Sequence, residues 1–213
     1  MLVVDDETVA AAYDARAAEY IALIGRIDQM ERADVAMIGR WRDETPDRLL
    51  DAGCGPGLWT AFLAEPTSRP AHGRDVVGVD VSAEFLTAAR ERHPGVRFES
   101  ASVRDLPFAE GSFGGVLAWY SLIHLPPDEL PAVLAELARV LAVGGRILIG
   151  YFDGEPRERF AHAVAPAYHW SAAALTPLLE SVGLHVVLAE RREREPGAAG
   201  SVRPHGAIIA ERR

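Results

Sequence analysis

The sequence predicts an α/β fold in which an open, doubly wound and mostly parallel sheet of seven strands is covered on both faces by helices. Two patterns indicate this fold. Short, nearly continuous apolar runs, typical of strands buried on both faces, alternate with longer segments whose apolar residues recur at helical spacing. Clusters of glycine and proline separate these segments. Because parallel strands need crossover connections, the alternation favours a parallel sheet with helices on either side.

The first half of the chain provides four of the expected strands. Two amphipathic stretches, residues 8–23 and 29–41, open the chain as helices. Residues 48–51 then form a strand that runs into a glycine-rich loop and a helix at 58–65. Ser82 is a suitable N-cap for the next helix, because its hydroxyl can accept a hydrogen bond from a first-turn amide. The strands of this half are residues 48–51, 76–80, 96–100 and 116–120.

The second half completes the sheet and contains two further helices. A helix with a single apolar stripe opens at Pro127, and the glycine pair at 144–145 is expected to end it. Ser171 caps the second helix, which closes at Gly183 in the left-handed conformation. A charged segment rich in Gly and Pro, residues 191–206, is expected to be a solvated hairpin loop. The remaining strands are residues 146–152, 184–190 and 207–210.

Composition restricts the classes of function. Asp and Glu number 31 against 22 Lys and Arg, a formal net charge of -9, so the average surface potential repels phosphate backbones and argues against a nucleic-acid partner. The sequence contains no lysine, which excludes Schiff-base lysines and a P-loop lysine. Cys54 is the only cysteine, so neither an internal disulfide nor a cysteine-based zinc site can form within one chain, and we predict no metal site.

The sequence also predicts where in the cell the protein is found. The N-terminus turns acidic after four residues and lacks a basic start followed by an apolar stretch, so we expect no signal peptide. No uninterrupted apolar run is long enough to span a bilayer, which argues against a membrane partner. We therefore expect a cytoplasmic protein.

The strongest local signal is the loop after the first strand. Gly53, Gly55 and Gly57 stand at alternate positions and let backbone amides approach a ligand without interfering Cβ atoms. Asp51 before them can accept a hydrogen bond from a ligand ammonium group. A nicotinamide or flavin fingerprint requires glycines at another spacing, which falls on other residue types here. The spacing therefore disfavours an oxidoreductase of that class.

The segment LLDAGCGPG, residues 49–57, resembles the first motif of class I S-adenosylmethionine-dependent methyltransferases, and the resemblance extends from about Tyr13 to the C-terminus. It implies the Rossmann-like fold of that family, S-adenosylmethionine as cofactor and S-adenosylhomocysteine as product. In the family this loop, which includes Cys54, holds the methionine half of the cofactor. The chain is then a single domain of four parts. They are N-terminal cap helices (residues 1–43), a cofactor-binding core (48–152), a substrate lid (153–170), and a C-terminal helix and hairpin (171–213).

The ends of the second and third strands are expected to hold the adenosyl half. The carboxylate of Asp80 could accept hydrogen bonds from both ribose hydroxyls and looks like the family's ribose acid; the alternative is an acid favoured by the dipole of the helix that follows. Val81 would lie against the adenine. An acid of the family usually faces the adenine amine where this chain has Ser102. We expect the Ser102 hydroxyl and the Val103 backbone to share the adenine edge, with weaker binding to a neutral acceptor.

Aromatic residues are expected at the methyl group. Ala118, Trp119 and Tyr120 follow the fourth strand, in a region similar to the family's fourth motif, and should reach the pocket floor. Simple core packing is the alternative for Trp119. Tyr13 and Tyr20 lie in a segment that resembles the family's N-terminal cap helix, whose tyrosines close over the methyl group. Being seven residues apart, they share a helix face, and they would also do so in an amphipathic helix packed on the sheet edge.

Histidines are the candidate catalytic residues. His124 comes just after the fourth strand, where a neutral imidazole could take a proton from an attacking amine or hydroxyl; the alternative is a histidine that only caps or packs. His169 and His162 lie in the expected lid and are rivals for the same role.

Methyl transfer from a sulfonium mainly requires that the nucleophile, the methyl group and the sulfur be aligned and water excluded. The sequence thus predicts a methyltransferase acting on a small molecule. The alternative is a non-catalytic S-adenosylmethionine- or nucleoside-binding protein on the same fold, suggested by Ser102 and Gly114 at places where the family usually has acids. O-, N- and C-methylation are not distinguished, and a homodimer is left open.

Overall fold

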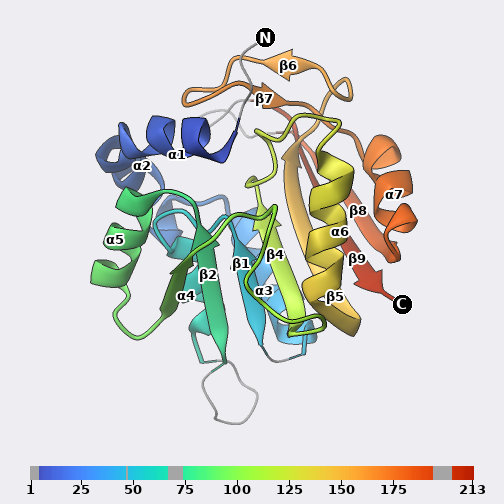
Figure 1. The fold of residues 1–213 in the computed structure, drawn as a ribbon, viewed down its shortest axis with the longest axis horizontal. Helices are drawn as coiled ribbons and strands as arrows, with labels where there is room; N and C mark the ends of the chain where they lie inside the picture. Colours follow the sequence, from blue (N-terminus) through green and yellow to red (C-terminus); the bar gives the residue numbers. More distant parts are fainter. Residues whose placement is uncertain (1–4, 47, 67–73, 194–202) are drawn as a thin grey trace.

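The computed structural model describes residues 5–46, 48–66, 74–193 and 203–213. Within them the chain forms a seven-stranded sheet in the order β3-β2-β1-β4-β5-β9-β8, flanked by helices (Figure 1). β1 to β5 run parallel, and β9 is antiparallel to both of its neighbours. The predicted mostly parallel, doubly wound sheet is confirmed. Its strands are β1 Leu49–Ala52, β2 Val76–Asp80, β3 Arg97–Ser100, β4 Phe113–Trp119, β5 Leu141–Phe152, β8 Leu184–Arg192 and β9 His205–Arg212.

Helices cover both faces of this sheet. On one face α6 and α7 pack on the strands, with Leu134 of α6 in the same buried cluster as Val116 of β4. On the other face α3 and α4 bury Trp41 and Leu63 beside Leu117. The helices are α1 Asp6–Asp14, α2 Ala17–Ile24, α3 Arg32–Glu44, α4 Leu58–Ala64, α5 Ala83–Arg92, α6 Leu130–Val140 and α7 Ala172–Ser181, with a 3₁₀ turn at Ile27–Gln29.

α3 packs directly against the sheet and is part of the hydrophobic core. A Cβ atom at Gly115 of β4 would lie 2.4 Å from Cγ2 of Thr45 and 3.0 Å from Cζ2 of Trp41, so only glycine lets the end of α3 approach the sheet this closely. The cap expected over residues 1–43 is therefore divided. α1 and α2 lie at the carboxyl edge of the sheet, whereas α3 packs on its face (Figure 1).

Strand register brings the predicted site loops together. β1 lies between β2 and β4, which is the point where the strand order reverses. The amides of Gly53 and Cys54 donate hydrogen bonds of 2.8 and 2.9 Å to the Val79 carbonyl, so the chain leaving β1 folds over the end of β2. In open α/β sheets, ligands bind in the crevice at such a switch point.

The first helix differs from its prediction. Residues 8–23 form two helices, because α1 ends at Asp14 and Arg16 leaves the helical conformation with φ -122° and ψ 10°. Helical periodicity continues across this break, so the pattern does not reveal it. The second predicted helix, residues 29–41, is a 3₁₀ turn followed by α3.

The glycine pair at 144–145 also differs from its prediction. α6 ends at Val140, and the next residue already belongs to β5, so the pair lies inside the strand as an irregularity in its pairing with β4. A Cβ atom at Gly145 would lie 2.8 Å from the Ala142 carbonyl oxygen and 2.9 Å from that of Gly114. The glycines therefore permit a bulge and do not cap the helix.

Both serine caps are confirmed. The Ser82 hydroxyl accepts from the Phe85 amide at 3.1 Å, and that of Ser171 from the Ala174 amide at 3.3 Å. Gly183 is in the left-handed conformation, as predicted.

The expected lid contains a short hairpin, β6 Arg159–Phe160 and β7 Ala167–Tyr168, which lies above the carboxyl edge of the sheet (Figure 1). The middle of the expected solvated loop, residues 194–202, falls outside the described residues. No helix in the described ranges combines the length and the hydrophobicity needed to cross a bilayer.

Candidate active site

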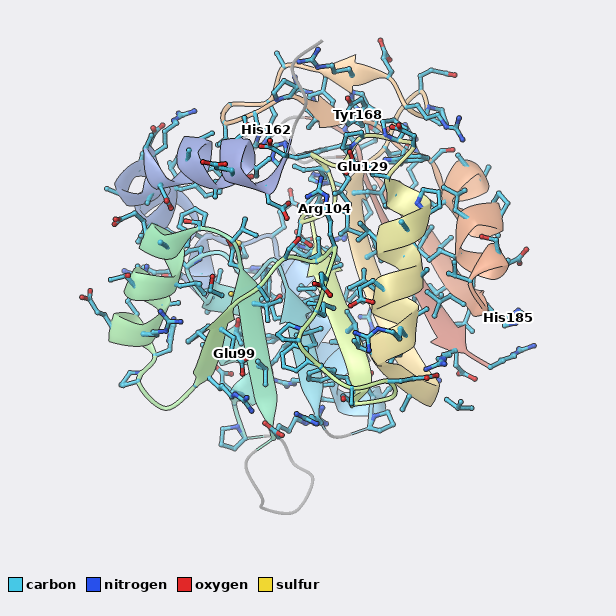
Figure 2. All side chains as sticks on the ribbon, viewed as in Figure 1. Glu99, Arg104, Glu129, His162, Tyr168 and His185 are labelled. Carbon is cyan, nitrogen blue, oxygen red and sulfur yellow. The ribbon has the colours of Figure 1, made fainter. Side chains whose placement is uncertain are left out.

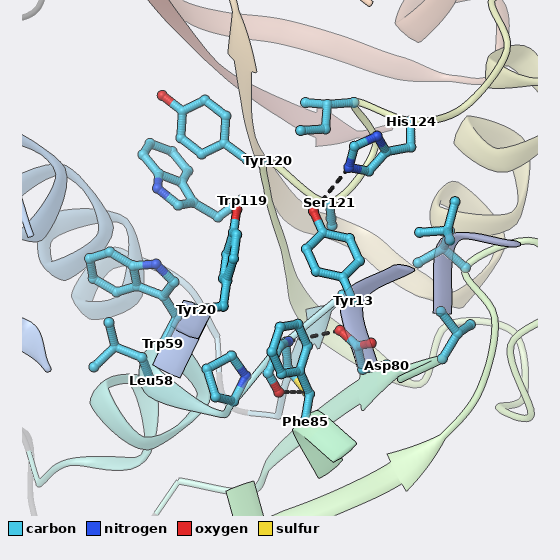
Figure 3. A pocket seen from close by; sticks show the side chains of 18 of the residues that line it. Tyr13, Tyr20, Leu58, Trp59, Asp80, Phe85, Trp119, Tyr120, Ser121 and His124 are labelled. Atoms are coloured by element: carbon cyan, nitrogen blue, oxygen red, sulfur yellow. Dashed lines mark hydrogen bonds between the residues drawn. The ribbon is translucent and has the colours of Figure 1, made fainter. Parts of the chain in front are cut away.

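A cavity of about 290 Å³ lies at the carboxyl edge of the sheet, between α1, α2 and the loops after β1, β2 and β4 (Figure 3). Most of the cofactor residues predicted from sequence line it, namely Tyr13, Tyr20, Gly53, Cys54, Gly55, Asp80, Val81, Val103, Trp119 and Tyr120. The lining does not include the other four: Asp51, Gly57, Ser102 and Ala118.

The glycine loop forms one wall of the cavity. Gly53 has φ +80°, and a Cβ atom there would lie 2.2 Å from the Cβ of Ser121, so this position excludes every side chain. At Gly55 the nearest atom to an added Cβ, in the Phe85 ring, is 3.9 Å away. The backbone at Gly55 thus leaves space for a ligand on the cavity side, while its amide is committed to Asp80.

Asp51 lies beneath this loop. It is 2% exposed, and its Oδ2 accepts a hydrogen bond of 2.7 Å from the Thr60 hydroxyl. Burial raises the pKa of Asp51 to about 7, against the lowering effect of the Thr60 hydrogen bond. Burial also raises the pKa of the Cys54 thiol well above its ordinary value, so that side chain is a neutral part of the wall.

The position of Asp80 is compatible with both interpretations of the sequence, a ribose acid and an acid beside a helix N-terminus. Its Oδ1 accepts from the Ser82 amide at 2.8 Å, as expected of an acid beside a helix N-terminus. Its Oδ2 accepts from the Gly55 amide at 2.8 Å, and the residue lines the cavity. Burial raises the pKa of Asp80, and the two amides oppose this effect. Each oxygen keeps a second lone pair, so the carboxylate could still accept hydroxyl groups of a ribose.

Aromatic rings form the opposite wall. The ring of Tyr13 lies 5.4 Å from those of Tyr20 and Phe85, measured between centroids, and Trp119 lies 6.4 Å from Trp59 (Figure 3). The pairs Tyr13–Tyr20 and Trp119–Trp59 are edge-on and the pair Tyr13–Phe85 is tilted; such arrangements stabilise packed rings and offer π faces to a cation.

Tyr120 is held in a strained conformation at the end of β4. Its φ is +57°, which is unfavourable for a bulky side chain. Its ring packs 5.0 Å from Phe152, and its hydroxyl is hydrogen-bonded to Nδ1 of His205. These contacts hold the Tyr120 ring, which lines the cavity, in spite of the backbone cost.

His124 has a defined tautomer. The Pro166 carbonyl can only accept, so Nδ1 of His124 carries the proton that it donates at 2.9 Å. Nε2 is then the acceptor of the 2.9 Å hydrogen bond from the Tyr13 hydroxyl (Figure 3). Burial lowers the pKa of His124 below its ordinary value, which favours the neutral imidazole. Burial likewise keeps the Tyr13 hydroxyl protonated by raising its pKa.

The structure separates the two histidines of the expected lid. His162 lines the cavity, with its ring 5.2 Å from that of His124, and burial and the neighbouring His124 lower its pKa to about 4. His169 is not among the lining residues and packs 4.3 Å from the Phe160 ring. The geometry therefore offers His124 and His162 to a ligand, and not His169. Among the residues described, no three His, Cys, Asp or Glu side chains are grouped as metal ligands would be.

Asp6, Asp34 and Arg104 all line the cavity, although the sequence did not predict them there. Asp6 of α1 contacts Ser102 and Arg104 at the end of the cavity near β3, and Arg104 is also bonded to Glu129. Figure 2 shows Arg104 and Glu129 near the same edge of the sheet as His162. From sequence, Asp6 only looks like an acid just before the predicted helix at residues 8–23, which is a common helix-stabilising feature.

The family comparison agrees with this geometry. A family model described as a methyltransferase domain matches residues 49–145, the segment that supplies the cavity's loops. Methyltransferase GfsG of Streptomyces halstedii is 39% identical over 108 residues, covering 48% of this chain and 36% of that protein. A demethylmenaquinone methyltransferase of Beutenbergia cavernae is 31% identical over 160 residues, covering 70% of this chain and 62% of that protein. The chain thus spans less than two thirds of the length of either relative.

A solved structure shares the fold of this chain. The 1,6-didemethyltoxoflavin-N1-methyltransferase of Burkholderia thailandensis, solved with 1,6-didemethyltoxoflavin and S-adenosylhomocysteine, matches with a TM-score of 0.73 at 24% identity. The match covers 100% of this chain and 92% of that one. At this identity the match shows a shared fold. Residues 49–145 match the methyltransferase domain family, and the relatives that the chain resembles are methyltransferases.

Proposed function

We propose that the protein transfers a methyl group from S-adenosylmethionine to a small-molecule acceptor. The observation that carries this proposal is the joint presence of the open glycine loop, the Asp80 carboxylate and the aromatic wall in one cavity. The methyltransferase names of both relatives support it. The net charge of -9 argues against a nucleic-acid acceptor.

The residues divide the work of binding and alignment. The open backbone at Gly55 would leave room for the methionine part of the cofactor, and the carboxylate of Asp80 would hold its ribose. Tyr20 and Trp119 would pack near the sulfur and exclude water, because aromatic faces attract a positive sulfonium without a full negative charge. When bound, the cofactor supplies an electrophilic methyl group. The protein then has mainly to place a nucleophile in line with it.

The histidine geometry favours an acceptor that must lose a proton. A neutral His124 whose Nε2 faces Tyr13 can receive a proton through the Tyr13 hydroxyl or directly, once an acceptor replaces that hydroxyl. Oxygen acceptors depend on such a base more than neutral amines do. We therefore assign His124 as the base and favour a hydroxyl-bearing acceptor with an aromatic or apolar body, to match the rings of Tyr120 and Phe152.

Calorimetry on ligand-stripped protein tests cofactor binding. S-adenosylhomocysteine should bind to the wild type, and Asp80→Asn should weaken binding about tenfold or more because the neutral amide is a poorer acceptor for the ribose hydroxyls. Glu84→Gln, an exposed neighbour on α5, serves as the control. No heat of binding to the wild type would contradict the proposal.

Turnover separates an enzyme from the non-catalytic alternative. A panel of phenols, naphthols and aliphatic alcohols with S-adenosylmethionine should yield methylated product, detected by mass spectrometry. Binding of the cofactor without methylation of any hydroxyl, amine or carbon acceptor would favour the non-catalytic protein instead.

A further inference from the structure

α1 is held over the cavity by an acidic side chain at each end. It has no buried residue, so core packing does little to fix it. At its C-terminal end Asp14 accepts from the Ser82 hydroxyl and, at 3.2 Å, from the Glu84 amide at the start of α5. At its N-terminal end Asp6 is bonded to Ser102 and Arg104 beyond β3. α1 therefore bridges the two loops between which an adenosyl group would lie.

The cavity near Asp6 has the chemistry of a slot for a planar base. Its walls there include Val9 of α1 and Val81, Ala101 and Val103 from the ends of β2 and β3. The carboxylate of Asp6 is at the edge of this slot, with its side chain 34% exposed. A flat apolar slot with an anionic edge suits a heteroaromatic ring that carries a hydrogen-bond donor.

The Asp6 carboxylate retains acceptor capacity. Oδ2 accepts from the Ser102 hydroxyl, and Oδ1 accepts from the Arg104 guanidinium. A carboxylate has about four lone-pair positions, so each oxygen can accept one more donor. Arg104 is bound on its other side by Glu129, at 2.8 and 3.0 Å, which leaves it as a support that orients Asp6.

Ser102 is committed to the same network. Its hydroxyl proton points to Asp6, and its oxygen accepts the Arg104 amide at 3.0 Å. The serine that sequence reasoning placed at the adenine amine thus works through Asp6, because a carboxylate is the stronger acceptor.

We infer that Asp6 accepts the exocyclic amine of the cofactor's adenine and so selects adenine over bases that carry a carbonyl at that position. This inference rests on the proposed function, because it presumes an adenosyl ligand with its ribose at Asp80. An oxygen in place of the amine would face the Asp6 carboxylate with lone pairs and no proton, which is repulsive. The same contact would fasten α1, and with it Tyr13, over the bound cofactor.

Binding of two ligands to four proteins tests the inference. S-adenosylhomocysteine carries an amine on its base. At the same position S-inosylhomocysteine carries a 6-oxo group, and the neighbouring ring nitrogen carries a proton. The wild type should prefer the adenosyl ligand by at least tenfold. Asp6→Asn should bind it about 10- to 100-fold more weakly, and the preference should shrink or reverse because the amide can donate to the oxo group. Ser102→Asp combined with Asp6→Asn should restore the preference.

Glu7→Gln removes the same charge from the same helix turn at an exposed position and should leave both affinities unchanged. If Asp6→Asn lowers the affinity for both ligands equally, Asp6 only fixes the position of α1, and the inference is overturned. The inference is also overturned if Asp6→Asn changes neither the affinity for S-adenosylhomocysteine nor the ratio of the two affinities. If the wild type binds neither ligand, the proposed function fails instead, so the two failures are distinguishable.

Discussion

At the scale of single residues, the folded geometry defines the tautomer of His124, which the sequence alone does not. A carbonyl at Pro166 and a hydroxyl at Tyr13 together define which imidazole nitrogen carries the proton. Neither partner is near His124 in sequence, and Tyr13 is 111 residues away. The chemical assignment therefore depends on contacts that only the folded chain makes.

Replacing His124, the proposed base, should lower turnover and leave cofactor binding intact. His124→Gln should lower kcat for a hydroxyl acceptor about 10²- to 10⁴-fold, the usual contribution of a general base. His169→Gln is the matched control, since that histidine is not in the cavity lining. Steady-state kinetics and calorimetry on both variants check this, and an equal loss in the two would contradict it.

The dependence of kcat/KM on pH should also reflect the protonation of His124. The base works only while His124 is neutral, and burial lowers its pKa below the ordinary value of 6.5. The acid limb of kcat/KM is therefore expected below pH 6.5, with full activity above it. An acid limb above pH 6.5 in the wild type would contradict the assignment of a buried, neutral His124.

Asp51 should make stability depend on pH in the opposite sense to most carboxylates. Its pKa is about 7 in the folded protein, against 3.8 for an unperturbed Asp, so the folded state binds more protons between these values. This contribution to the free energy of unfolding is greatest below pH 3.8 and is lost as pH rises through 7. In ligand-free protein, Asp51→Asn should abolish that decline, with the Asn oxygen still accepting from Thr60. Urea unfolding at pH 5 and pH 8 measures the difference.

At the scale of elements, the loop after β1 is specified by sterics that one substitution can test. Gly53→Ala combines a left-handed φ with a Cβ 2.2 Å from that of Ser121, and should cost about 3 kcal/mol of stability. Gly183→Ala has a similar φ but no heavy atom within 4 Å of the added Cβ, so it should cost only about 1 kcal/mol. Chemical denaturation of both variants separates the steric clash with Ser121 from the backbone strain of a left-handed φ. Equal losses of stability in the two variants would mean that the chain relieves the clash with Ser121.

The elements themselves were largely predictable because their signals are local. The β2 strand and the Ser82 cap of α5 follow from residues adjacent in the chain. The break between α1 and α2 and the β5 bulge at residues 144–145 were not predicted. In both places the chain follows tertiary contacts, with α1 tied to α5 and β5 paired with β4, and local propensity is compatible with either outcome.

For the whole molecule, ligand binding should couple to global stability. S-adenosylhomocysteine at 100 times its dissociation constant should add about 2.7 kcal/mol to the free energy of unfolding. For a chain of 213 residues this corresponds to a rise in Tm of about 5–10 °C. Calorimetric or fluorescence melting checks the shift, and its absence with a ligand that calorimetry shows to bind would mean that the unfolded chain binds it as well.

By itself the sequence determined the alternating strands and helices, the glycine loop and the acid at the end of β2, because periodicity and turn chemistry act between near neighbours in the chain. Only the tertiary structure decided that Asp6 stands at Ser102, that Tyr13 meets His124, and that His162 faces the cavity. The first two contacts join residues 96 and 111 positions apart. Long-range pairs of this kind leave no pattern in a single sequence, since each partner alone resembles an ordinary surface or packing residue.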